Sequence, residues 1–279
     1  MTSHPEARVA YLVRRRVLDQ VGAIFADANV RALLVKGAGL AETVYPEPWR
    51  RTMADIDLIV RPQALAVALE ALGAAGIEVV PVPPERRYSF GVFEERTALV
   101  SVGPLRVLVE VHTGLDKVVP HPIAWSAVWD RAVTVEGLPP SLLVPSFEDH
   151  VLLVVLHVAL SEFEHPSAWD DLQALWHAGL DFDAVALRAK EWGLTLSLEL
   201  ALARLSERHA ALDLAALRSN CPSSGVRSAI ARRVFAHRGR RTVGLTWLAK
   251  QTVLREDPAR WLFGLVRFAV LRGADRWPW

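Results

Sequence analysis

The sequence has only one cysteine, Cys221, among 279 residues, so it forms neither an intramolecular disulfide nor a zinc site made of cysteines. Lysine is scarce too: the 32 basic residues include just Lys36, Lys117, Lys190 and Lys250. No run of 18 or more apolar residues occurs, which argues against a membrane-spanning helix. The first residues, MTSHPEARVAYLVRRR, lack the continuous apolar core of a signal peptide. We therefore expect a cytoplasmic protein with no transmembrane segment.

The composition is that of a packed globular protein. Apolar residues make up 52% of the chain and charged residues 23%, a balance that excludes general disorder. The length allows one large domain or two of ordinary size.

The net charge of +1 hides an asymmetry along the chain. Residues 218–279 hold 13 Lys/Arg against 3 Asp/Glu, whereas the preceding residues hold 19 against 28. A basic end on an acidic body indicates either an anionic partner or contact between the two parts. Because the basic segment is also rich in Leu, Val, Phe and Trp, we favour a helix with one buried face over binding to nucleic acid or to a membrane surface.

The hydrophobic periodicity predicts both strands and helices before about residue 140, and helices alone after it. Before that point the pattern predicts helices over 6–28, 36–44 and 62–72, and strands over 31–35, 55–60, 77–80, 89–93, 98–102 and 105–112. After it, the predicted helices cover 147–163, 167–177, 182–192, 196–209 and basic stretches to the end. We therefore predict an α+β fold: residues 1–140 form a mixed sheet flanked by helices, and residues 141–279 form an all-helical domain.

The strand DIDLIV carries two acids where an apolar strand is expected. Side chains alternate along a strand, so Asp55 and Asp57 share one face while Ile56, Leu58 and Val60 share the other. Ionised carboxylates are rarely buried without a partner, and a divalent metal ion is the simplest partner for two of them. The alternatives are a solvated edge strand, or the Asp-x-Asp motifs of haloacid-dehalogenase phosphatases and of glycosyltransferases.

A third acid, Glu110, lies in the alternating strand LRVLVEVH. If the two strands pair, three carboxylates converge and suit one or two Mg²⁺ or Mn²⁺ ions. Upstream, Lys36 and Gly37 stand between a strand and a helix, where an ammonium and backbone N–H groups are available to a triphosphate. Arg51 either contacts phosphate or neutralises the charge of the acids. We interpret His112 as a structural residue that forms hydrogen bonds.

These residues resemble the signature of a bacterial family of uncharacterised nucleotidyltransferases in the polymerase-β-like superfamily. The resemblance rests on LLVKGAGLAETVYPEPWRRTMADIDLIV, on VEVH, and on EDHVLLVVLHVA with AWDDLQAL in the helical part, and it covers roughly residues 15 to 180. The sequence departs from the wider superfamily at the phosphate-binding turn. That turn usually carries Gly-Ser or Gly-Gly, whereas here it carries Lys36-Gly37. The gap between the turn and the aspartates is also shorter in the superfamily than in this sequence.

The resemblance implies a polymerase-β-like domain and a metal-dependent nucleotidyltransferase that moves an NMP from an NTP to an unidentified acceptor, a small molecule or a protein. It implies that Asp55, Asp57 and Glu110 are metal ligands and catalytic residues, and it is consistent with Lys36, Gly37 and Arg51 in nucleotide binding. Two alternatives stay open at this point: a phosphotransferase acting on the γ-phosphate, and a non-catalytic nucleotide-sensing or partner-binding module.

Overall fold

A computed structural model of the protein describes residues 5–82, 95–115, 121–209, 225–236 and 244–276. The chain forms two compact units. The sheet unit comprises Met1–Lys117, Ser126–Ser146 and Phe268–Trp279, and the helical unit comprises Val118–Trp125 and Phe147–Arg267. The domain boundary at residue 140, expected from the sequence, stays a prediction.

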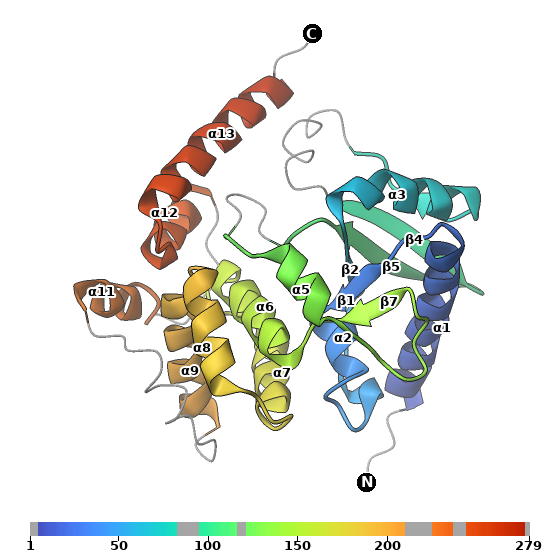
Figure 1. The fold of residues 1–279 in the computed structure, drawn as a ribbon, viewed down its shortest axis with the longest axis horizontal. Coiled ribbons are helices and arrows are strands. Elements are labelled where there is room, and N and C mark those ends of the chain that lie inside the picture. Colours follow the sequence, from blue (N-terminus) through green and yellow to red (C-terminus); the bar gives the residue numbers. More distant parts are fainter. Residues whose placement is uncertain (1–4, 83–94, 116–120, 210–224, 237–243, 277–279) are drawn as a thin grey trace. The chain divides into compact units, whose positions relative to one another are not determined.

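All strands in the described residues belong to one seven-stranded mixed sheet in the sheet unit (Figure 1). Their order across the sheet is β3-β4-β5-β2-β1-β7-β6. The bounds are β1 Ala32–Val35, β2 Asp55–Val60, β3 Glu78–Val79, β4 Arg96–Val102, β5 Leu105–His112, β6 Val133–Thr134 and β7 Leu142–Val144.

Strand β2 lies at the centre of this sheet and has two different kinds of neighbour. It pairs antiparallel with β1, where Val35 is opposite Asp57, and parallel with β5, where Asp57 is opposite Glu110. A strand with partners on both edges has its backbone groups satisfied, so its position is set by the whole sheet. The residues that begin β2 are therefore held next to the end of β5.

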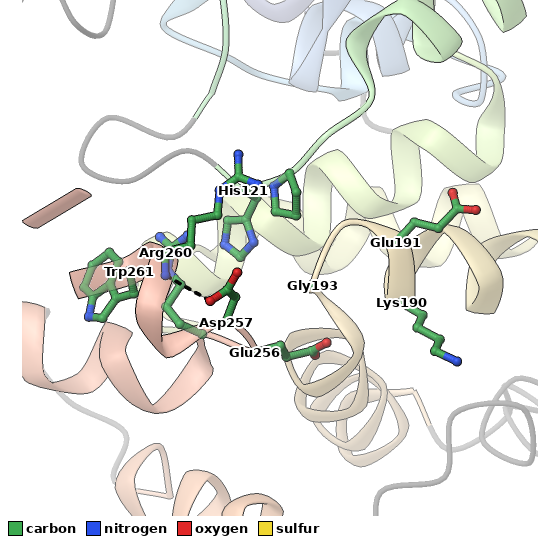
Figure 2. A pocket seen from close by; sticks show the side chains of 10 residues that line it. His121, Lys190, Glu191, Gly193, Glu256, Asp257, Arg260 and Trp261 are labelled. Carbon is green, nitrogen blue, oxygen red and sulfur yellow. Dashed lines mark hydrogen bonds between the residues drawn. The ribbon is translucent and has the colours of Figure 1, made fainter. Parts of the chain in front are cut away.

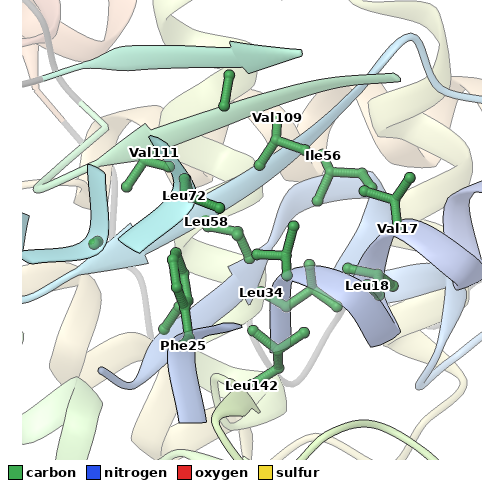
Figure 3. Close-up of a cluster of buried hydrophobic side chains, with 14 of the residues drawn as sticks. Val17, Leu18, Phe25, Leu34, Ile56, Leu58, Leu72, Val109, Val111 and Leu142 are labelled. Atoms are coloured by element: carbon green, nitrogen blue, oxygen red, sulfur yellow. The ribbon is translucent and has the colours of Figure 1, made fainter. Parts of the chain in front are cut away.

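One face of the sheet carries the hydrophobic core of the unit (Figure 3). Ile56 and Leu58 of β2 and Val109 of β5 are fully buried there, beneath α1 (Pro5–Asp27) and α3 (Leu65–Ala74). Burial of such side chains contributes roughly 1.5–3 kcal/mol each. The alternation along β2 thus has the predicted consequence: apolar side chains face the core, and the aspartates face the other way.

Strands β4 and β5 form a hairpin with a two-residue loop. Val102 pairs with Leu105 across Gly103 and Pro104, and Gly103 has φ +59°, a value that favours glycine. Since loop length fixes the register of a hairpin, this turn also decides which residues lie opposite each other at the far end of the two strands.

The remaining elements of the sheet unit are short. They include α2 (Lys36–Ala41), α5 (Trp125–Arg131) and the 3₁₀ turns Pro48–Arg50 and Pro62–Ala64. The helical unit contains α6 Phe147–Leu160, α7 Pro166–Trp176, α8 Phe182–Glu191, α9 Thr195–Arg208, α11 Val226–Val234, α12 Gly244–Leu254 and the first part of α13 Pro258–Arg276.

The α+β class is confirmed: a mixed sheet with helices is followed by a mostly helical region. The helix expected over 36–44 ends at Ala41, the one expected from Pro62 begins as a 3₁₀ turn, and the strand expected over 89–93 lies outside the described residues. In the basic C-terminal segment Trp261 is buried, but Leu262, Phe263, Val266 and Val270 of α13 are exposed, so those four do not form the buried face that we expected. Within the described ranges, no helix is both long enough and apolar enough to cross a bilayer.

Candidate active site

Acidic and imidazole side chains meet on the sheet face opposite the core. Asp57 on β2, Glu110 on β5 and His112 on β5 each place one oxygen or nitrogen atom within 4.8 Å of the others. The parallel register brings Asp57 next to Glu110, and the two-residue alternation of β5 puts His112 on the same face. Asp57 and His112 are buried and Glu110 is partly exposed. This group has the donor atoms of a divalent metal site.

Asp55 shares the face of Asp57 but lies outside that closest group. Burial raises the pKa of Asp55, and the negative charges of Asp57 and Glu110 raise it further. These charges act on Asp55 because all three carboxylates face the same region. Of the three predicted acids, Asp57 and Glu110 lie in the closest group, and Asp55 lies on the same face of β2.

Lys36 supplies the positive charge in this cluster. Its Nζ lies 2.6 Å from Oδ1 of Asp57, and its backbone has φ +52°, in the left-handed region that non-glycine residues rarely adopt. Such strain persists where the surrounding structure holds it, often at functional sites. The turn after β1 thus directs the lysine to the start of β2.

The hydrogen bonds of Asp57 keep it ionised. Burial alone would raise the pKa of Asp57, but the hydrogen bond from His112 and the charge of Lys36 outweigh it and lower the pKa to about 2. The hydrogen bond from His112 also lowers the pKa of Glu110. Conversely, burial opposes protonation of His112, yet its hydrogen bonds to Asp57 and Glu110 raise its pKa overall. The site therefore holds anionic carboxylates at neutral pH.

Beside Lys36, a glycine makes room for an arginine. A Cβ atom on Gly37 would lie 2.9 Å from Cζ of Arg51, so any side chain there would displace the guanidinium. Arg51 is buried and donates a hydrogen bond to the carbonyl of Thr52. The role of Gly37 visible in the structure is thus to admit Arg51 next to the turn.

A second arginine, Arg14 of α1, extends this basic region. Burial lowers the pKa of Arg14, and so does the adjacent positive charge of Arg51. Its Nη2 atom is buried and has no hydrogen-bond partner among the described residues. A buried guanidinium donor without a hydrogen bond, close enough to Arg51 to be affected by its charge, suits an anion such as phosphate.

The helical unit contains a separate pocket of about 190 Å³ (Figure 2). Its lining has as many basic as acidic side chains: Lys190, Arg255, Arg260, Glu191, Glu256 and Asp257. Nδ1 of His121 donates to the carbonyl oxygen of Trp192 at 3.1 Å, and Glu256 accepts from the backbone N–H of Leu196. Because the acids and bases balance and Glu256 caps α9, the lining indicates no particular ligand.

The sequence pointed to most of these residues but not all. Asp57, Glu110 and Lys36 lie together, Asp55 shares the face of Asp57, and Gly37 lies beside Arg51. The roles expected for these residues stay predictions. Arg14 was missed, because an arginine on a surface helix gives no signal of its own. Glu95, which directly precedes β4 and lies 3.6 Å from Nδ1 of His112, was also missed.

A central strand with two aspartates, a glutamate on its parallel neighbour and basic side chains beside them is typical of enzymes that process nucleoside triphosphates. Residues 2–209 match the sequence profile of a family described as uncharacterised nucleotidyltransferases, and the chain belongs to that family. The resemblance expected from the motifs is thereby confirmed, and the family implies an enzyme with an NTP substrate.

Comparisons with curated proteins and with solved structures add little to the family assignment. None of the curated proteins matches the chain. A solved structure entitled "tRNA-processing enzyme (apo form 2)" is similar over 92% of this chain and 79% of its own, at 16% sequence identity and a TM-score of 0.26. A likeness this low carries no argument about function.

Proposed function

We propose that the protein is a divalent-metal-dependent nucleotidyltransferase that transfers an NMP from an NTP to an acceptor hydroxyl or other nucleophile and releases pyrophosphate. The observation that carries the proposal is the register of β2 and β5, which gathers Asp55, Asp57 and Glu110 beside the ammonium of Lys36. Family membership supports the reaction class, and the grouped acids support the use of a metal.

The residues present fit a divalent cation. Asp57, Glu110 and His112 offer two carboxylate oxygens and one imidazole nitrogen, and Asp55 adds a third carboxylate nearby. Carboxylates suit both Mg²⁺ and Mn²⁺, while the imidazole favours Mn²⁺ over Mg²⁺. When bound, such a cation neutralises phosphate charge and increases the nucleophilicity of the attacking oxygen.

The basic residues of the chain would hold the triphosphate. Lys36 and Arg51 flank the turn after β1, and the buried donor of Arg14 is available next to Arg51. Charge-assisted hydrogen bonds from these groups bind phosphate oxygens and fix the nucleotide relative to the acids. Positioning and charge neutralisation supply most of the catalysis in this kind of reaction.

In the proposed reaction, the acceptor oxygen forms a bond to the α-phosphorus while the bond from that phosphorus to the bridging oxygen breaks. The electron pair of the broken bond leaves with pyrophosphate, whose charge Lys36 and Arg51 stabilise. Glu110 takes the proton of the acceptor, because it is ionised at neutral pH and is more exposed than Asp57.

The same site would also support transfer of the γ-phosphate, so the experiment must separate the two reactions. The protein is incubated with Mn²⁺, a cell extract as the source of acceptors, and ATP labelled at either the α- or the γ-phosphate. The proposal predicts α-label in an acceptor together with release of pyrophosphate. Incorporation of γ-label alone would establish a phosphotransferase instead, and incorporation of neither would favour a nucleotide-sensing module.

Asp57→Asn and Asp19→Asn provide a matched pair of variants for this assay. Asp57 belongs to the buried acid group, whereas Asp19 forms a partly exposed ion pair with Arg15 on α1. Label transfer should disappear only in the first variant.

A further inference from the structure

Glu95 lies opposite His112 at the open end of the β4–β5 hairpin. The antiparallel register pairs Thr97 with Glu110 and Arg96 with Val111, and Glu95 directly precedes β4, so continuing the register by one residue would bring it opposite His112. Residues opposite each other in an antiparallel pair send their side chains to the same face. Glu95 is therefore on the sheet face that carries Asp57 and Glu110.

The imidazole of His112 lies between carboxylates on both sides. Its Nε2 is 3.0 Å from Oδ1 of Asp57 and 3.3 Å from Oε2 of Glu110, and its Nδ1 is 3.6 Å from Oε2 of Glu95. The His112 side chain is only 2% exposed and that of Glu95 11% exposed. In this orientation of the ring both nitrogens face carboxylates.

A carboxylate is seldom buried without a specific partner, because desolvation of the charge is costly. The arrangement is similar to that around metal-binding histidines, in which one ring nitrogen faces the metal and the other faces a carboxylate. Here Nδ1 and Oε2 of Glu95 are at ion-pair distance, slightly too far apart for a hydrogen bond. In such sites the carboxylate fixes the orientation and the tautomer of the ring. It also makes the nitrogen that faces the metal a stronger electron-pair donor to the metal.

We propose that Glu95 is a positioning residue, which acts through His112 to keep Nε2 directed at Asp57 and Glu110. The inference rests on the proposed function, since it assigns Glu95 to the support of the same metal site. Glu95 itself touches neither the nucleotide nor the metal in this proposal; its effect passes through the ring.

The first test measures Mn²⁺ binding by calorimetry in Glu95→Gln, which keeps the shape of the side chain but removes its charge. Loss of such a supporting carboxylate weakens metal affinity by about 10–100-fold, and we expect a loss in that range. Glu78→Gln is the matched control, because Glu78 lies on β3 of the same sheet and pairs with Arg106 at the surface. It should bind Mn²⁺ like the unmodified protein.

A double-mutant cycle with His112→Gln separates positioning from a general effect on structure. If Glu95 acts through the imidazole, Glu95→Gln should cause no further loss of Mn²⁺ affinity once His112 has been replaced. Equal losses in both backgrounds would overturn the proposal, as would unchanged affinity in Glu95→Gln. Glu95→Asp should recover part of the affinity because it restores the charge.

A second test uses nitrogen-15 NMR of the histidine side chains. The spectra are recorded after removal of metal with EDTA. The Nδ1–H signal of His112, assigned by its loss in His112→Gln, should change in chemical shift and exchange faster in Glu95→Gln. An identical signal in both proteins would overturn the inference. If the unmodified protein binds no Mn²⁺ at all, the proposed function fails, whereas the NMR result still decides whether Glu95 positions His112.

Discussion

Asp57 and Glu110 are register partners on the parallel strands β2 and β5, so their carboxylates leave the same face of the sheet side by side. Parallel neighbours keep an even spacing along their length, which holds two such residues at a fixed separation. The opposite face of the same strands is packed with Ile56, Leu58 and Val109. Burial of that face therefore holds the acids together against their mutual repulsion, with Lys36 and His112 to offset it.

Asp57→Asn should abolish divalent-dependent NTP binding and leave the fold intact, because the two side chains have nearly the same shape. Loss of a preorganised charge of this kind lowers activity by about 10²-fold or more. Calorimetry with Mn²⁺ and a non-hydrolysable NTP checks the prediction, with circular dichroism for the fold. Unchanged binding in Asp57→Asn would show that the metal site is elsewhere.

Lys36→Ala should weaken NTP binding far more than NMP binding, since the ammonium is expected to contact the distal phosphates. A hydrogen bond to a charged group contributes about 1.5–3 kcal/mol, which corresponds to a loss of roughly 10–100-fold for the NTP. Lys250→Ala, which removes an ion pair with Glu162 in the helical unit, serves as the control. Equal losses for NTP and NMP would assign Lys36 a structural role at Asp57 instead.

Arg14→Gln should reduce NTP affinity by a similar factor and leave Mn²⁺ binding unchanged, because its buried Nη2 has no hydrogen bond and it is no part of the metal-binding group. Arg16→Gln on the exposed side of the same helix is the matched control. Fluorescence titration with a labelled NTP would measure both. If the two variants bind the nucleotide equally well, Arg14 does not contact it.

Gly22→Ala should destabilise the protein even though alanine favours helices. A Cβ atom at this position of α1 would lie 2.4 Å from Cβ of Pro139, and overpacking of that kind costs about 1–3 kcal/mol. Gly73→Ala in α3 meets nothing within 4 Å and should stabilise the protein by up to about 1 kcal/mol. Urea unfolding of both variants tests the pair, and the same sign of change in both would contradict the packing argument.

His121→Asn should make the helical unit less sensitive to acid. Burial lowers the pKa of His121 to about 3, and the nearby positive charge of Arg255 adds to the effect. Between about pH 6.5 and 3 the unfolded chain therefore binds a proton that the folded chain does not, and folding stability falls as the pH falls. The contribution of one such group is about 1.4 kcal/mol per pH unit in that window.

Thermal unfolding of His121→Asn and the unmodified protein across pH 7.5 to 4.5 provides the measurement. The asparagine side chain retains an N–H donor for the carbonyl of Trp192, so the variant should stay folded at pH 7.5. Its advantage over the unmodified protein should grow as the pH is lowered. A constant difference at every pH would show that His121 binds a proton equally well in the folded and the unfolded chain.

The sequence by itself determined the local parts of this site. Alternation along DIDLIV and LRVLVEVH settles which side chains share a face, because the period of a strand is two whatever its partners are. The glycine and proline between β4 and β5 also fix the hairpin register, which ends with Arg96 opposite Val111, one residue from Glu95 and from His112. Glu95 was nevertheless missed, because the strand predicted over 98–102 begins three residues after it, whereas β4 begins at Arg96.

Only the tertiary structure decided how the separate parts meet. Asp57 and His112 are 55 positions apart, and their hydrogen bond depends on parallel pairing of β2 with β5, which no local pattern specifies. The left-handed backbone of Lys36, the contact between Gly37 and Arg51, and the place of Arg14 beside them likewise depend on packing of distant segments. Propensity and periodicity act over a few residues, whereas burial of one shared core selects among the many ways in which those segments can be assembled.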